Sequence, residues 1–279
     1  MKSTIHVPAL SHPQVGVVAY HRPVTRLLAF IPHPDDESYS FGGTIALAAR
    51  RGWECHVICV SSGEKGKRHD GGPAGREAVG ATREAELRRS CSILGAKPPA
   101  FLHMPDGAVR TVELGPSAIA GLLDRFAAEI VVTLGSDGAY GHPDHLAVHR
   151  WVSAAWSARP ASRGGALLYP VFPRGLFLPQ WEKCRHMLGE PPDPPAEAVG
   201  SDSFHYEVDI RAVRETKLAS IAAHRSQLPG GDPEAIFPPG IVSSLLDKER
   251  FHDATGQRSP GTADLLASLS AGAEHLRHT

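Results

Sequence analysis

The sequence predicts an α/β protein in which a mostly parallel sheet carries helices on both faces. Three observations predict it. Short, continuous apolar runs recur between residues 27 and 134, as expected for strands that are covered on both sides. Helical stretches lie between these runs, and glycine or polar loops separate the two. This alternation is typical of a parallel sheet, whose ligands bind at the carboxyl ends of its strands.

The elements follow one another in a regular order. We expect strands at the apolar runs 27–31, 56–60, 100–103 and 130–134, the first of them buried and the last covered on both faces. We expect helices at 38–50, 77–94 and 117–128. Gly52 and Gly95 end the first two helices, since glycine is common just past a helix C-terminus. The segment 61–75 is polar and rich in glycine, which predicts a loop.

After residue 170 the pattern is less regular. Residues 171–200 are rich in proline and predict a long surface excursion or lid. Residues 204–210 alternate like a strand, and 213–224 are helical. We therefore expect a single domain over 1–279, with a core at about 26–227 and with 171–200 and 228–279 as peripheral segments. The tail would cover the site, mediate association or be partly disordered.

Composition narrows the classes of function. A formal charge of −1 over 279 residues gives no electrostatic case for nucleic acid or an anionic membrane. No apolar stretch has the length of a spanning helix, and the first residues do not resemble a signal peptide. The four cysteines form no CxxC pair, which favours a reducing, cytoplasmic location. A homo-oligomer is left open.

The tripeptide His-Pro-Asp occurs twice, within His33–Glu37 and within His142–His145. Each copy follows an apolar run and precedes a helical stretch. Glu64 and Asp106 follow the second and third expected strands. Because parallel strands end at the same edge of the sheet, these loops predict one common site.

Helix capping explains one such motif, because proline and a carboxylate suit the first helical turn. It does not explain a histidine before each proline, or three consecutive acids at 35–37. A metal site does: His33, Asp36 and His145 offer two imidazoles and a carboxylate, a set that suits Zn²⁺ and also Fe²⁺. Asp35 is then free to act as a base. His149 is a rival ligand that we assign to packing or to supporting a ligand.

The two histidine motifs, in this order, resemble the signature of the PIG-L (LmbE-like) family of zinc-dependent de-N-acetylases. Supporting matches are the Gly63-Glu64-x-Gly66 loop, Arg83-x-x-Glu86, Asp106-Gly107, and Lys217 followed by His224-x-Ser226-Gln227. The resemblance runs from about residue 26 to 227. It implies a Rossmann-like fold and removal of the acetyl group from an N-acetylglucosamine unit of a small glycoconjugate.

The resemblance also implies roles for individual residues. His33, Asp36 and His145 would hold the metal, with Asp35 as the general base. His142 would protonate the leaving amine or steady the oxyanion, with Asp144 orienting its ring. Tyr140 would stabilise the tetrahedral intermediate. Three further residues would contact the substrate: Arg83, Asp106 and Glu64.

Two alternatives use the same residues. One is an amidase that cleaves a thiol–sugar conjugate, and the other is a sugar- or metal-binding module without catalysis. Nucleotide binding is disfavoured, because no GxGxxG follows the first expected strand. Four basic residues of one loop region would meet an acidic substrate group or simply face solvent: Lys65, Lys67, Arg68 and Arg76.

Overall fold

The computed structural model describes residues 24–111 and 116–271 of the chain. Within them a seven-stranded sheet has the order β3-β2-β1-β4-β5-β7-β6. The strands are β1 (Arg26–Ile31), β2 (Glu54–Ser61), β3 (Ala100–Met104), β4 (Ile130–Val132), β5 (Ala166–Pro170), β6 (Tyr206–Asp209) and β7 (Lys248–Asp253). The strands from β3 to β5 in this order pair in parallel, and β7 pairs antiparallel with β5 and β6. The predicted α/β class is confirmed.

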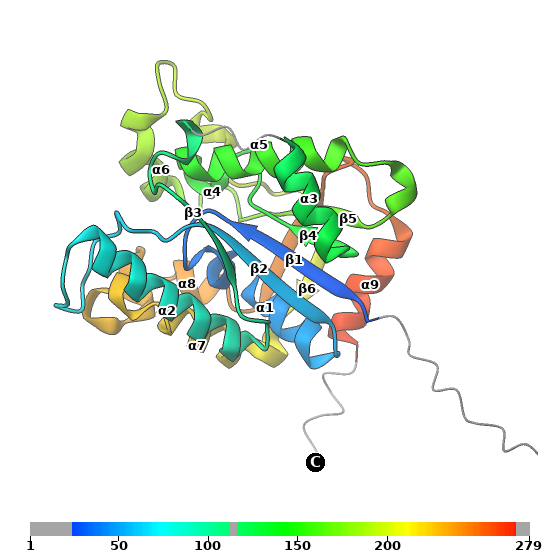
Figure 1. Cartoon of the computed structure of the whole chain (residues 1–279), viewed down its shortest axis with the longest axis horizontal. Helices are drawn as coiled ribbons and strands as arrows, with labels where there is room; N and C mark the ends of the chain where they lie inside the picture. Colours follow the sequence, from blue (N-terminus) through cyan, green and yellow to red (C-terminus); the bar gives the residue numbers. More distant parts are fainter. Residues whose placement is uncertain (1–23, 112–115, 272–279) are drawn as a thin grey trace, which may run out of the picture.

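Helices cover both faces of the sheet (Figure 1). They are α1 (Asp36–Arg50), α2 (Arg76–Leu94), α3 (Pro116–Phe126), α4 (Gly138–Gly141), α5 (Pro143–Ser157), α6 (Leu178–Cys184), α7 (Arg214–Ala222), α8 (Ile241–Ser244) and α9 (Pro260–Ser270). Helices α1, α2, α7 and α9 lie on one face, and α3 and α5 on the other.

The strand period of two builds a core on each face. On β1, Leu27 and Ala29 face the cluster that contains Ile45 of α1, whereas Leu28 and Phe30 face the cluster that contains Val148 of α5. All four of these β1 side chains are fully buried. The continuous apolar run that predicted β1 is thus explained by burial on both sides.

The segments expected to be peripheral contribute more than expected. Strand β7, from the tail, lies inside the sheet between β5 and β6, and α9 contacts α1. The sequence also gave no prediction for β5. Residues 171–200 form α6 with short helical turns around it.

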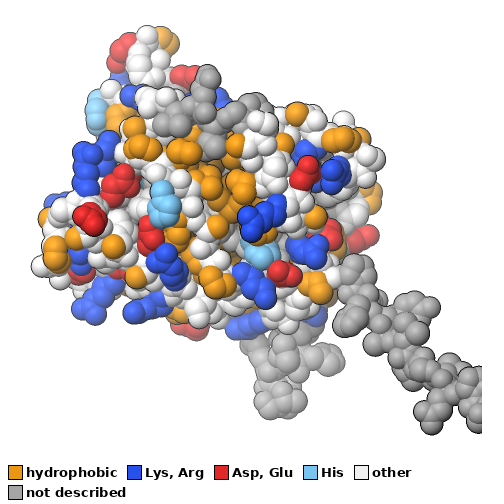
Figure 2. All heavy atoms as spheres, in the orientation of Figure 1, with side chains coloured by type: hydrophobic (Ala, Val, Ile, Leu, Met, Phe, Trp, Pro, Cys, Tyr) orange, Lys and Arg blue, Asp and Glu red, His pale blue; other side chains and the backbone are white. Residues whose placement is uncertain are grey.

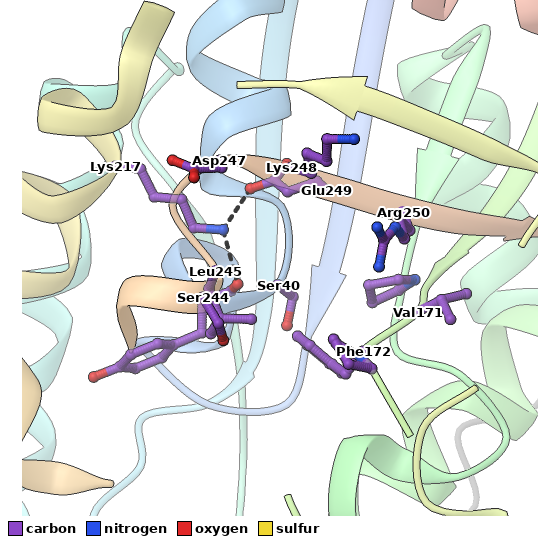
Figure 3. A pocket seen from close by; sticks show the side chains of 13 residues that line it. Ser40, Val171, Phe172, Lys217, Ser244, Leu245, Asp247, Lys248, Glu249 and Arg250 are labelled. Carbon is purple, nitrogen blue, oxygen red and sulfur yellow. Dashed lines mark hydrogen bonds and ion pairs between the residues drawn. The ribbon is translucent and has the colours of Figure 1, made fainter. Parts of the chain in front are cut away.

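Helix α1 is interrupted at Phe41, whose φ and ψ are −152° and 21°. The interruption leaves backbone groups without helical partners. The two side chains of a buried ion pair form hydrogen bonds with these groups instead. Glu249 of β7 accepts hydrogen bonds from the N–H groups of Gly43 (2.8 Å) and Thr44 (2.7 Å). Lys217 of α7 donates to the carbonyl of Tyr39 at 3.1 Å and to Glu249 at 2.6 Å (Figure 3). The kink is therefore held from two other elements.

The visible surface carries charges of both signs. Figure 2 shows apolar side chains along the middle of one face, with basic and acidic side chains scattered on either side. No broad region of this face is of one charge, in agreement with the formal charge of −1. Among the described residues, every helix is too short or too polar to cross a membrane.

Candidate metal centre and active site

Three predicted ligands meet beyond the carboxyl ends of β1 and β4. His33 follows β1, Asp36 begins α1, and His145 lies in the first turn of α5. His33 Nδ1 is 3.2 Å from His145 Nε2 and 3.5 Å from an Asp36 carboxylate oxygen. The other oxygen of Asp36 is 3.5 Å from His145 Nε2. Bonds of 2.0–2.1 Å in a tetrahedral zinc site place donor atoms about 3.3 Å apart, so this donor set fits such an ion.

Neighbouring groups set the orientation of both rings. His145 Nδ1 lies 3.1 Å from the carbonyl of Gly138, so it carries the proton and leaves Nε2 free for an ion. His33 Nε2 faces carboxylate oxygens of Asp106 (3.2 Å) and Asp144 (3.4 Å), which leaves Nδ1 free. Burial alone would lower the pKa of His33, but the hydrogen bonds to Asp106 and Asp144 help to raise it. Two groups of converging donor atoms are found among the described residues, His33 with His142 and His145, and His33 with Asp106 and Asp144; they share His33.

The Asp144 carboxylate contacts other groups than the His142 ring, which was its expected partner. Its carboxylate accepts from the N–H of Gly107 at 2.6 Å and faces His33, rather than His142. Its backbone N–H donates to His142 Nδ1 at 3.2 Å, which makes His142 the N-cap of α5. The main chain of Asp144, and not its carboxylate, therefore orients the His142 ring. Helix capping and a site role coexist in this motif.

Asp35 lies at the N-terminus of α1 with an unusual backbone. Its φ is 124°, in a region that residues other than glycine rarely adopt. One carboxylate oxygen is 3.1 Å from the Arg83 guanidinium. Burial raises the pKa of Asp35 to about 6, against the opposing effect of Arg83 and with a further upward contribution from Asp36. Such a pKa suits a general base near neutral pH.

Glu37 holds the backbone of Asp35 through a hydrogen bond, a role that the sequence did not reveal. It is fully buried, and one oxygen accepts from the N–H of Asp35 at 3.1 Å. The other oxygen accepts from Ser90 at 2.5 Å and lies 2.8 Å from His224 Nε2. Glu37 and His224 both stood in matched motifs, but only the fold reveals that they touch.

The three expected substrate contacts all lie around the site, and each is already engaged with the protein. Arg83 donates to the carbonyls of Gly63 at 2.9 Å and Pro34 at 2.6 Å, besides its contact with Asp35. Glu64 accepts from the N–H of Asp106 at 2.9 Å. Asp106 accepts from the N–H of Lys65 at 2.7 Å. In this structure these side chains fix the loops after β1, β2 and β3.

His142 and Tyr140 lie beside the predicted metal ligands. The His142 ring centroid lies 4.9 Å from that of His33 and 4.7 Å from that of His145. The Tyr140 ring lies 5.2 Å from His145. Burial, together with the nearby His145 and His33, lowers the pKa of His142 to about 2, so its ring is neutral. Burial raises the pKa of Tyr140 well above its usual value, which keeps the phenol protonated.

His149, the rival ligand, lies apart from this cluster. Its Nδ1 is 2.9 Å from the carbonyl of Leu134, and its ring lies 4.8 Å from that of Tyr169. It is not among the groups of donors that converge in the described residues. A packing role accounts for these contacts.

A cavity of about 220 Å³ opens beside the ligands. Asp35, Asp36 and His145 line it, together with aromatic residues from several elements. Phe177 comes from the excursion 171–200 and Phe237 from the tail. Both segments that were expected to be peripheral therefore contribute to the wall of the cavity.

Comparisons with known proteins agree with this geometry. The PIG-L family profile, described as GlcNAc-PI de-N-acetylase, matches residues 28–156. A 1D-myo-inositol 2-acetamido-2-deoxy-alpha-D-glucopyranoside deacetylase from Saccharomonospora viridis is 30% identical over 266 residues, which is 85% of this chain and 98% of the relative. The chain belongs to the PIG-L family. A protein of the same name from Mycobacterium sp. (strain JLS) is 37% identical over 290 residues, 88% of this chain and 91% of the relative.

The fold has counterparts among solved structures. The N,N'-diacetylchitobiose deacetylase from Pyrococcus horikoshii aligns with a TM-score of 0.58 at 20% identity, over 87% of this chain and 89% of that one. At this identity the likeness concerns the fold. The prediction that the protein is an N-deacetylase of the PIG-L family is confirmed by the family match and the named relatives.

Proposed function

We propose that this protein is a zinc-dependent hydrolase that removes the acetyl group from the N-acetylglucosamine unit of a small glycoconjugate. The observation that carries the proposal is the meeting of His33, Asp36 and His145 at 3.2–3.5 Å, with Asp35 beside them. The relatives named as deacetylases of an acetamido-glucopyranoside of inositol support the substrate class. Two imidazoles and one carboxylate suit Zn²⁺, and amide hydrolysis needs no redox-active metal.

Asp35 serves as the base of this reaction. A divalent ion, when bound, polarises the acetyl carbonyl and lowers the pKa of water. Asp35 then accepts a proton from the attacking water and passes it to the departing nitrogen as the amide C–N bond breaks. The products are acetate and the free amine. A carboxyl with a pKa near 6 is suited to both transfers.

His142 steadies the oxyanion in this mechanism. Because the N–H of Asp144 donates to Nδ1, the neutral ring carries its proton on Nε2. A neutral N–H is a hydrogen-bond donor rather than a strong acid, which favours oxyanion stabilisation over protonation of the amine. Tyr140, with a phenol that stays protonated, offers a second donor, and its ring lies 5.2 Å from that of His145 and 6.1 Å from that of His142.

The test is an acetate-release screen with metal analysis. Substrates are N-acetylglucosamine, its glycosides and a longer amide conjugate, and the proteins are wild type, Asp35→Asn and His145→Ala. Asp35→Asn should keep the metal and lose roughly 10²–10⁴-fold in turnover. His145→Ala should lose both metal and activity, since two ligands hold an ion poorly. Asp264→Asn and His186→Ala, both exposed, are matched controls.

Two results would contradict the proposal. One is a metal-loaded wild type that releases no acetate from any N-acetylglucosamine derivative. The other is full turnover by Asp35→Asn, which would remove the base from the mechanism.

A further inference from the structure

One buried carboxylate beside the site joins three elements of the chain. Glu37 of α1 is fully buried, and its Oε1 accepts from Ser90 of α2 at 2.5 Å and lies 2.8 Å from Nε2 of His224, which follows α7. Helices α1, α2 and α7 pack against one another on one face of the sheet (Figure 1). Because the other oxygen of Glu37 accepts from the N–H of Asp35 at 3.1 Å, this carboxylate connects Ser90 and His224 to the backbone of Asp35.

The residues that follow His224 hold it in place for this contact. Two positions later, the N–H and the hydroxyl of Ser226 donate to the carboxylate of Glu86 on α2 at 2.6 and 2.7 Å. The carbonyl of Ser226 accepts from the N–H of His69, in the loop after β2, at 2.8 Å. The segment 224–226 is thus fixed to a helix and to a loop, and the fully buried His224 ring is directed at Glu37.

His224 lies away from the reacting groups. It lines none of the three cavities found among the described residues, and it belongs to neither group of converging metal donors there. Its ring contacts Glu37 through Nε2. Because burying a carboxylate is costly, an apolar residue would pack at position 37 more favourably. What the carboxylate adds is an acceptor for the Asp35 N–H, and His224 is one of its two side-chain partners.

We propose that His224 is a positioning residue for the base: it fixes the Glu37 carboxylate, and Glu37 in turn holds the backbone of Asp35 at its φ of 124°. The proposal rests on the proposed function, in which Asp35 transfers the proton. A catalytic group that is displaced by about 1 Å can lose roughly 10²-fold in rate. A weaker hold on Glu37 therefore lowers turnover, while the contacts to metal and substrate stay in place.

The experiment compares His224→Met with His224→Gln in acetate release by the metal-loaded protein. Methionine fills a similar space without a donor, whereas the amide of glutamine can donate to Glu37 as the ring does. His224→Met should lose roughly 10–10²-fold in kcat, with KM within about twofold of wild type and with bound metal unchanged. His224→Gln should retain most of the wild-type kcat. His56→Met is the matched control, because it breaks another histidine–glutamate pair, with Glu54 at the start of β2, and should keep the wild-type kcat.

A combined variant separates positioning from a general loss of structure. If His224 acts through Asp35, then Asp35→Asn/His224→Met has the kcat of Asp35→Asn alone, because the base is already absent. Losses that multiply in the combined variant overturn the inference. So does a wild-type kcat in His224→Met or, if that variant does not fold, in Ser90→Ala, which removes the other side-chain donor to Glu37.

Unfolding free energies test the same contact without turnover. Glycine alone adopts the φ of residue 35 freely, so Asp35→Gly should be more stable than Asp35→Ala. This advantage should shrink by roughly half or more when His224→Met is added, and it should keep its size when His56→Met is added. An advantage that His224→Met leaves unchanged overturns the inference, even in a protein that releases no acetate. A reduced advantage in a protein that releases no acetate supports the hold of His224 on position 35 and refutes the proposed function alone.

Discussion

At the scale of single residues, Asp35 is the most constrained position of the site. Its φ of 124° is unfavourable for any side chain, and such strain costs of the order of 1–3 kcal/mol. Glu37 holds its N–H and Arg83 holds its carboxylate, so the fold maintains the conformation from two sides. In this conformation Asp35 lines the cavity together with Asp36 and His145.

Because of this strain, we expect glycine to be more stable than alanine at position 35, the reverse of the usual order in a helix. Asp35→Gly should be more stable than Asp35→Ala by about 1 kcal/mol, because both remove the carboxylate and only glycine accepts this φ freely. Thermal or urea unfolding of the two variants measures the difference. Ser92, on the exposed side of α2, is the control: there alanine should be more stable than glycine. Equal order at both positions would show that Asp35 is not strained.

At the scale of elements, the kink of α1 depends on the Lys217–Glu249 pair. Both side chains are almost fully buried. Replacing a buried ion pair by apolar residues is often neutral or stabilising, because it avoids the cost of burying charge. Here the pair also satisfies two N–H groups and one carbonyl of α1, which no apolar residue can do.

The double variant Lys217→Met/Glu249→Met should therefore lose roughly 3 kcal/mol or more in free energy of unfolding, since three backbone groups lose partners at about 1–3 kcal/mol each. Urea unfolding measures the loss. The exposed pair Arg163–Asp124 is the control, and its double replacement by methionine should change stability by less than about 1 kcal/mol. If Lys217→Met/Glu249→Met were as stable as wild type, the ion pair would not be needed to hold the kink of α1.

At the scale of the whole molecule, the ligand set joins distant parts of the chain. His33 follows the first strand and Asp36 begins the first helix, whereas His145 belongs to α5 on the opposite face of the sheet. An ion bound to all three resists the separation of these layers, because it binds the folded chain and not the unfolded one.

Metal removal should consequently lower the melting temperature. Free metal at a hundredfold excess over its Kd stabilises by about 2.7 kcal/mol, or roughly 5–10 °C for a chain of this size. Differential scanning calorimetry with and without a chelator measures the shift. His145→Ala should show little response to the chelator, and a wild type with no shift would argue against the site.

Much of this architecture was predictable, and the exceptions have physical causes. Strands β1, β2 and β4 were predictable because they are largely buried on both faces, and the edge strand β3 was predictable from its apolar run although it is only partly buried. Strand β7 did not, since its inward residues are Glu249, Phe251 and Asp253, and two of these are acids. Glu249 serves the kink of α1, and Asp253 accepts a hydrogen bond from Tyr206. Because acidic residues occupy two of the buried positions, β7 lacks the alternation of apolar and polar residues that predicts a strand.

The site shows the same division. The meeting of His33, Asp36 and His145 followed from motifs at the ends of parallel strands. The sequence did not predict which atom of Asp144 faces which ring, because proximity along a chain does not determine side-chain direction. Gln180 and Phe237 line the cavity from segments without a periodic pattern, and only the fold brings them to Tyr39 of α1.

The position of β7 has a consequence for synthesis in the cell. The ribosome makes α1 long before Glu249, so a nascent chain first carries Asp36 on a helix whose break has no partner. The gap between β5 and β6 also closes only when β7 emerges. Catalytic competence should therefore arise only after β7 has been synthesised, and chains that stop short of residue 253 should be inert.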